Sequence, residues 1–188
     1  MTKSANLGTT ERSQMGEALL ERRPFLRLDA IPVAPSLTPS QERGLCNART
    51  LCEDDVPQLV RALVDHTLAA PTRNARLRPL FGPVNVSVLN RRRRVATEWL
   101  RAVLAGGLDE ATLRQVGRSW LPQLTGAGPE PGAALALGRE CFEYVRGAFA
   151  ARLLDEPCDN LVPRALALDA VETVLRAHLR AFEAAQLG

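Results

Sequence analysis

The feature that most restricts the fold of this chain is the three-and-four spacing of its apolar side chains. Over residues 130–154 this stripe runs through Leu135, Gly138, Phe142, Val145, Phe149 and Leu153. Over residues 161–186 it runs through Leu168, Val171, Val174 or Leu175, His178 and Phe182. This spacing is the period of an α-helix with one face to bury. Because a single amphipathic helix is marginal in water, such helices need one another, and the pattern predicts an all-α fold.

Proline, glycine and capping residues divide the chain into separate helices. Thr38 precedes Pro39, a pair typical of a helix start, and Asp54 or Asp55 offers a cap before Pro57. Gly106-Gly107 supplies residues that accept a positive φ after a helix. These signals predict helices near residues 38–52, 54–70, 84–105, 109–124, 130–154 and 161–186, with no convincing strand between them.

The first part of the chain differs in composition from the rest. Residues 1–37 are polar at first and then rich in proline, as in "IPVAPSLTPS". We therefore expect a partly disordered N-terminal arm over 1–37 and one folded domain over 38–188. A chain of 188 residues that is 46% hydrophobic can bury the core of one such domain. Little sequence follows the last helix, so we expect the domain to stand alone without an output domain.

Charge and cysteine content argue against several classes of protein. The 24 basic residues are interspersed with 21 acidic ones, for a net charge of +3, so no basic field for nucleic acid is evident. The four cysteines lack C-x-x-C spacing and no export signal precedes them, which indicates reduced thiols. No apolar run reaches the ~18 residues of a membrane span. We therefore expect a soluble, cytoplasmic protein with no membrane or nucleic-acid partner.

Three segments resemble a known family. "LVRALVDHTLAAPTRNARLRPLFG" followed by "VLNRRRRVATEWLRAVLAGGLDEATL" resembles the B-to-E passage of the sensor globins, which comprise globin-coupled sensors and protoglobins. "VPRALALDAVETVLRAHLRAF" is similar to the last helix of that family, so the resemblance covers residues 38–186. It implies a globin-like fold of about six core helices. It also implies heme between the E and F helices, and a role in sensing oxygen or another diatomic gas.

The residue that holds the heme iron in that family is missing here. The resemblance places Trp120, four residues after Val116, where the F helix carries its proximal histidine. Residues 103–124 contain no histidine, cysteine, methionine or tyrosine, and an indole nitrogen cannot ligate iron. The resemblance thus implies heme, whereas the missing ligand argues against heme binding by this chain. The candidate pocket residues are Val95, Trp99, Val116, Trp120, Phe142 and His66.

The residues considered for a pocket or an iron site each have a structural interpretation as well. Trp120 fits a core residue or the wall of a small-molecule pocket. His66 matches a family histidine that does not ligate iron, so an interhelical or surface role is expected. His178 lies on the apolar stripe of the last helix, as a satisfied interface histidine, a pH switch or an alternative iron ligand. Cys141 is expected to be a small buried hydrophobe rather than a thiolate ligand.

The polar residues carry no catalytic signature. The run "NRRRR" covers residues 90–94, and on a helix its four arginine side chains point in nearly four directions. We therefore interpret it as a solvated flank rather than a nucleic-acid patch. No serine or cysteine has a histidine at a spacing in the sequence that indicates a nucleophile–base pair. The acidic residues fit helix surfaces and caps. We therefore expect no enzyme. These acidic residues are Glu98, Asp109, Glu110, Glu140 and Glu143.

A second resemblance gives the alternative function. "GRSWLPQLTGAGPEPGAALALGRECFEYV" resembles the amino-terminal domains of stressosome-type regulators, which have a globin-like fold without heme and act through protein contacts. The sequence therefore supports two hypotheses. One is a stand-alone sensor globin that binds heme and a diatomic gas. The other is a heme-less signalling or scaffold module with a protein partner, dimerising through the helices at 130–154 and 161–186.

Overall fold

The computed structural model describes residues 35–81, 83–125, 131–154 and 161–187, which form helices and turns with no strand among them. The predicted all-α class is confirmed. None of the helices in these ranges combines the length and apolarity needed to cross a bilayer. The elements are α2 (Pro39–Cys52), η1 (Glu53–Asp55), α3 (Val56–Arg73), η2 (Ala75–Leu80), α4 (Val86–Ala105), α5 (Glu110–Gln115), η3 (Val116–Trp120), α6 (Leu121–Thr125), α7 (Pro131–Leu154) and α8 (Val162–Leu187).

The helices correspond to the predicted segments, with ends that differ by up to three residues and with one segment divided. α3 continues to Arg73, through Pro71, and so ends three residues beyond the predicted boundary. The segment predicted as one helix over 109–124 is divided into α5, η3 and α6, where η3 is a π-helical turn. Of the N-terminal arm predicted for 1–37, residues 1–34 lie outside the described residues.

The caps are built by residues close in sequence. At the start of α2, the backbone N–H of Gln41 donates to Thr38 Oγ1 at 3.2 Å, and Thr38 N–H donates to Gln41 Oε1 at 3.0 Å. This reciprocal pair satisfies two N–H groups that a helix start leaves unpaired. The cap predicted from Asp54 or Asp55 is not made, because residues 53–55 form a 3₁₀ turn. Asp55 instead pairs with Arg152 of α7.

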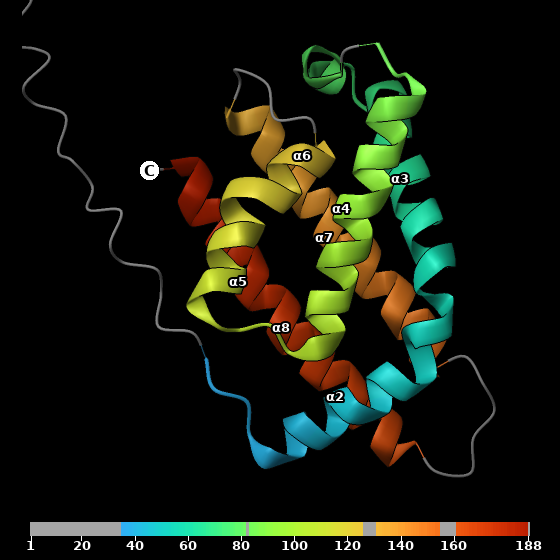
Figure 1. Cartoon of the computed structure of the whole chain (residues 1–188), viewed down its shortest axis with the longest axis vertical. Coiled ribbons are helices and arrows are strands. Elements are labelled where there is room, and N and C mark those ends of the chain that lie inside the picture. Colours follow the sequence, from blue (N-terminus) through green and yellow to red (C-terminus); the bar gives the residue numbers. More distant parts are fainter. Residues whose placement is uncertain (1–34, 82, 126–130, 155–160, 188) are drawn as a thin grey trace, which may run out of the picture.

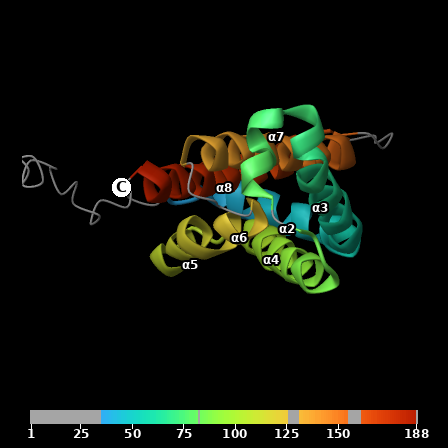
Figure 2. The ribbon, with the colours of Figure 1, turned by 90° about the horizontal axis from the view of Figure 1, so that it is seen from above.

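The last helix is the element around which the others pack. α8 contacts α2, α7 and η3 most extensively, and Figure 2 shows α7 and α8 on one side of the domain with α4, α5 and α6 on the other. The crossing of α2 on α8 is fixed at its exposed edge, where Gln41 Nε2 donates to Asp169 Oδ2 at 3.0 Å. The predicted apolar stripe of α8 faces inward, because Val171, Val174 and Phe182 are all fully buried.

A sharp turn after α4 sends the chain back along the core (Figure 1). Gly106 ends α4 with φ of 74°, a left-handed conformation that side chains with a Cβ rarely adopt. Asp109 then caps α5, accepting the backbone N–H of Thr112 at 2.9 Å. The predicted glycine turn is therefore confirmed at Gly106, and it brings the backbone of Gly107 toward α8.

Candidate functional site

Five of the six predicted pocket residues lie in one buried core. Val95 and Trp99 come from α4, Val116 and Trp120 from η3, and Phe142 from α7. The ring of Trp99 meets that of Phe142 edge-on, with centroids 5.0 Å apart. Trp99 has no exposed surface and Trp120 is 9% exposed. The fold thus brings these side chains into the same apolar core, where Trp99 and Phe142 pack directly against each other.

A buried hydrogen-bonded chain crosses this core. Trp99 Nε1 donates to Nδ1 of His178 at 3.1 Å, and Nε2 of His178 lies 2.6 Å from the carbonyl oxygen of Gly107. An indole N–H can only donate and a carbonyl can only accept, so the proton of the neutral imidazole sits on Nε2. Both ring nitrogens of His178 are therefore occupied, and the predicted role of a satisfied interface histidine is confirmed.

The environment keeps His178 neutral. Burial lowers the pKa of His178 to about 4, against smaller opposing effects from the Gly107 carbonyl and Asp109. Geometry points the same way, because protonating Nδ1 would set two donors, that nitrogen and the Trp99 N–H, against each other. His178 therefore acts as a neutral bridge between α8, α4 and the turn that follows α4.

The turn that carries Trp120 has an unusual backbone. The N–H of Leu121 donates to the carbonyl of Val116, five residues back, which defines a π turn. Pro122 explains why the π turn lies here, because proline has no backbone N–H to donate and the proline ring conflicts with the carbonyl four residues earlier. Gly117 packs against α8 so closely that a Cβ there would lie 2.7 Å from the carbonyl oxygen of Ala181.

Trp120 is buried without a partner for its polar atom. Its Nε1 is inaccessible and has no hydrogen-bond acceptor, in contrast to the paired Nε1 of Trp99. A buried unpaired donor costs stability, so the ring is held by its apolar contacts. The two tryptophans predicted for the pocket thus differ in their bonding although both belong to the core.

His66 lies apart from this group, between α3 and α7. Its Nε2 is 3.2 Å from Glu140 Oε1, and its ring stacks on that of Tyr144 with centroids 4.1 Å apart. Arg73 Nε donates to the same carboxylate at 3.0 Å. Partial burial, followed by the charge of Arg73, lowers the pKa of His66, while Glu140 opposes that shift. The expected interhelical role of His66 is confirmed.

The described side chains do not fit heme. Both nitrogens of His178 are engaged and the imidazole of His66 lies outside the apolar core. Burial raises the pKa of the Cys141 thiol to about 12, so this side chain remains the buried hydrophobe that was expected. η3 and α6 carry no side chain able to bind iron. Within the described ranges, no three histidine, cysteine or acidic residues are grouped as metal ligands either.

The arginine run differs from expectation at one position. Arg91, Arg93 and Arg94 are exposed, as predicted for a solvated flank, but Arg92 is only 5% exposed. Its guanidinium carbon lies 4.9 Å above the ring of Phe81, and Nη1 is buried without a hydrogen-bond partner. The signal for this burial is in the sequence, because Arg92 continues the three-and-four stripe formed by Val88, Val95 and Trp99.

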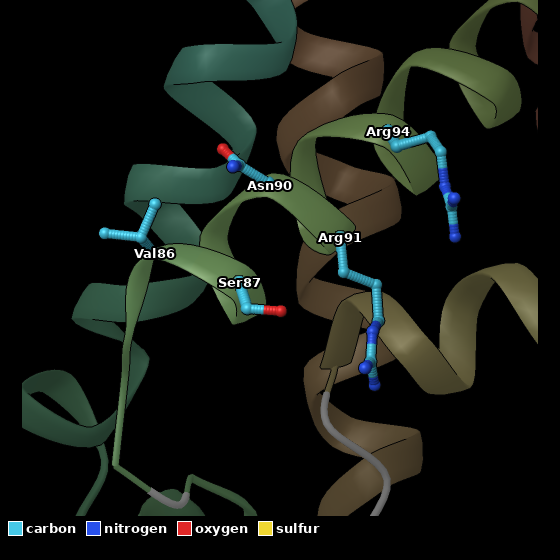
Figure 3. A pocket seen from close by; sticks show the side chains of 5 residues that line it. All are labelled: Val86, Ser87, Asn90, Arg91 and Arg94. Atoms are coloured by element: carbon cyan, nitrogen blue, oxygen red, sulfur yellow. The ribbon is translucent and has the colours of Figure 1, made fainter.

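A surface pocket opens beside the first turns of α4. Figure 3 shows Arg91 and Arg94 extending from the same side of the helix, with Ser87 and Asn90 near its start. Val86, which also lines this pocket, is 72% exposed. The pocket has a volume of about 620 Å³ and combines arginine side chains with one apolar group. Arg94 approaches Glu98 only at 4.0 Å, so its charge is weakly compensated.

Comparison of this chain with protein-family models, with curated proteins and with solved structures found no match. The resemblance to sensor globins therefore remains a prediction from the sequence.

Proposed function

We propose that this protein is a heme-less, globin-like helical module that works by binding a protein partner. The observation that carries the proposal is the packing of the predicted pocket. Trp99 is fully buried, edge-on to Phe142, with its N–H bonded to His178. A heme would need the space and the ligand that these contacts use. Heme binding and gas sensing are the competing proposal, and they lack a residue to hold the iron.

The surface that best fits a protein contact is the end of the domain formed by η2 and the start of α4 (Figure 1). We name it the basic end. No ion pair joins its exposed arginines to another described residue, except for the long contact of Arg94. Val84 and Val86 are 48% and 72% exposed beside them. The basic end comprises Arg76, Arg78, Val84, Val86, Arg91 and Arg94.

This composition favours an acidic protein surface as the partner. From 66 to 97 the sequence has seven arginines and no acidic residue, so the basic end has little internal compensation. Complementary charge speeds association and selects the partner, while exposed apolar side chains contribute the buried area. A nucleic acid would use the same charge, but the exposed side chains of the basic end include no aromatic group for base stacking.

A hemin titration tests the first half of the proposal. We expect one equivalent of hemin to give the spectrum of free hemin and to leave the thermal midpoint unchanged. A sharp Soret band at one-to-one stoichiometry, with a raised midpoint, would establish the competing heme proposal instead.

A crosslinking experiment tests the second half. A photoreactive amino acid at position 86 should capture an acidic protein in the native cell, and Arg91→Glu with Arg94→Glu should abolish the capture. The matched control is Arg180→Glu on the exposed side of α8, which makes the same type of charge change far along the chain. Capture that survives the α4 substitutions, or that disappears after nuclease treatment, would refute an acidic protein partner at this surface.

The homodimer predicted through α7 and α8 is a separate proposal with less support. Arg139 of α7 donates to Glu183 of α8 at 2.7 Å, and Arg146 reaches Glu172 at 3.5 Å. These ion pairs line the ridge between the two helices, whereas the cores of stable interfaces are depleted in charge. Sedimentation equilibrium distinguishes the monomer expected from this ridge from the predicted dimer.

A further inference from the structure

Arg92 is a buried cation to which no described residue supplies a counter-charge. Its side chain points from the inner face of α4 toward Phe81 and α7, and is 5% exposed. A guanidinium stays protonated in proteins, so the positive charge is retained even though burial lowers the pKa of Arg92. Burying an unpaired charge is costly to stability, and native proteins compensate it with a partner.

The described neighbours do not supply that partner. Phe81 covers the guanidinium through its ring face, which leaves the in-plane N–H of Nη1 without an acceptor. Cys141 is the titratable group whose charge would act on Arg92, but with a pKa of about 12 its thiol stays neutral. Glu140, next to Cys141, is bonded to Arg73 and His66.

The surrounding sequence cannot supply a carboxylate either. No Asp or Glu occurs from residue 66 to residue 97, the stretch that contains η2, Phe81 and the first half of α4. The same stretch places Arg91, Arg93 and Arg94 on the outside of the helical turn whose inner side carries Arg92. The electrostatic potential there favours anions over cations.

We propose that Arg92 is the centre of a binding site for a small monovalent anion, a carboxylate or a halide, under the ring of Phe81. The anion accepts the N–H of Nη1, which is the buried donor left without a partner. Phe81 is itself only half-buried, so the site lies one side chain below the surface. The site lies at the edge of the apolar core, where Phe81 packs against it. The proposal does not depend on whether the protein binds heme.

The test measures thermal stability while one anion replaces another at constant ionic strength. Chloride, acetate or formate is exchanged for gluconate, a much larger anion that serves as the reference. We expect the unfolding midpoint to rise with the small anion and to saturate. Arg92→Met should abolish the saturable rise, whereas Arg93→Met, which removes the neighbouring exposed charge, should retain it. A rise specific to chloride indicates a halide site, and one specific to acetate and formate indicates a carboxylate site.

A second measurement uses only the wild-type chain and so does not depend on how a variant folds. Bound chloride broadens the ³⁵Cl resonance, and for a halide site the broadening should be reversed by bromide. For a carboxylate site, ¹³C-labelled formate should show the corresponding saturable shift. The proposal is overturned if neither nucleus reports saturable binding, or if Arg92→Met responds to the small anions as the wild type does.

Discussion

The indole N–H of Trp99 and the Nδ1 of His178 meet at 3.1 Å, joining two helices across 79 residues of sequence. This contact uses the polar atom of one candidate pocket residue and one nitrogen of a candidate iron ligand. A second bond, from His178 Nε2 to Gly107, occupies the other nitrogen. Hydrogen bonds therefore join α4, α8 and the turn after α4 in the part of the core where the resemblance implies a cofactor.

The neutral state of His178 predicts a pH dependence of stability. Its pKa is about 4 in the folded chain, below the ordinary 6.5, so the unfolded chain binds more protons between these values. Stability is then complete above pH 6.5 and falls as the pH drops toward 4, by about 3 kcal/mol from this group. Urea unfolding at pH 7.5, 6, 5 and 4 measures the slope.

Two matched variants show which histidine causes the pH dependence of stability. His178→Gln should flatten it, and His66→Gln should leave most of it, because the imidazole of His66 is partly exposed. An unchanged slope in His178→Gln would show that other groups cause the pH dependence.

The two tryptophans should respond differently to phenylalanine. Trp99→Phe leaves Nδ1 of His178 without its donor, whereas Trp120→Phe removes an N–H that has no acceptor. We expect Trp99→Phe to be the more destabilising by about 1–3 kcal/mol. Chemical denaturation of both variants measures the difference. Equal losses would mean that ring volume, rather than bonding, sets the cost at both positions.

Gly117 should tolerate no side chain. A Cβ at this position would lie 2.7 Å from the backbone oxygen of Ala181, which belongs to a packed helix. Gly117→Ala should therefore destabilise the fold by about 1–3 kcal/mol. Gly147→Ala is the control, since nothing lies within 4 Å of its added Cβ, and it should stabilise α7 by ~0.5–1 kcal/mol. Thermal midpoints of the pair test the close crossing of η3 on α8.

The pKa of His66 should follow the charges around it. Glu140 raises this pKa while Arg73 lowers it, and burial is the largest single cause of the shift. Glu140→Gln is therefore expected to lower the pKa of His66 further, and Arg73→Gln to raise it. Proton NMR of the imidazole resonances follows both, and His178→Gln identifies the remaining signal. Either shift in the opposite direction would contradict the arrangement of Arg73, His66 and Glu140.

Interactions between residues close in sequence determine the features that are predictable from the chain alone. Helix positions, the Thr38 cap and the Gly106 turn depend on residues within about four positions of one another, and the apolar period identifies the buried face. The same period places Trp99 and Phe142 in the interior. It also places Arg92 there, although a run of four arginines suggests a solvated flank.

The bonding inside the core depends on how the helices pack. The partner of Trp99 lies 79 residues away, and that of His66 lies on α7, so neither follows from spacing along the chain. A buried donor is satisfied only where another element brings an acceptor within ~3 Å. Packing places an acceptor beside the N–H of Trp99 but none beside the buried N–H groups of Trp120 and Arg92. The period of a helix decides which side chains turn inward, and the neighbouring elements decide which atoms those side chains contact.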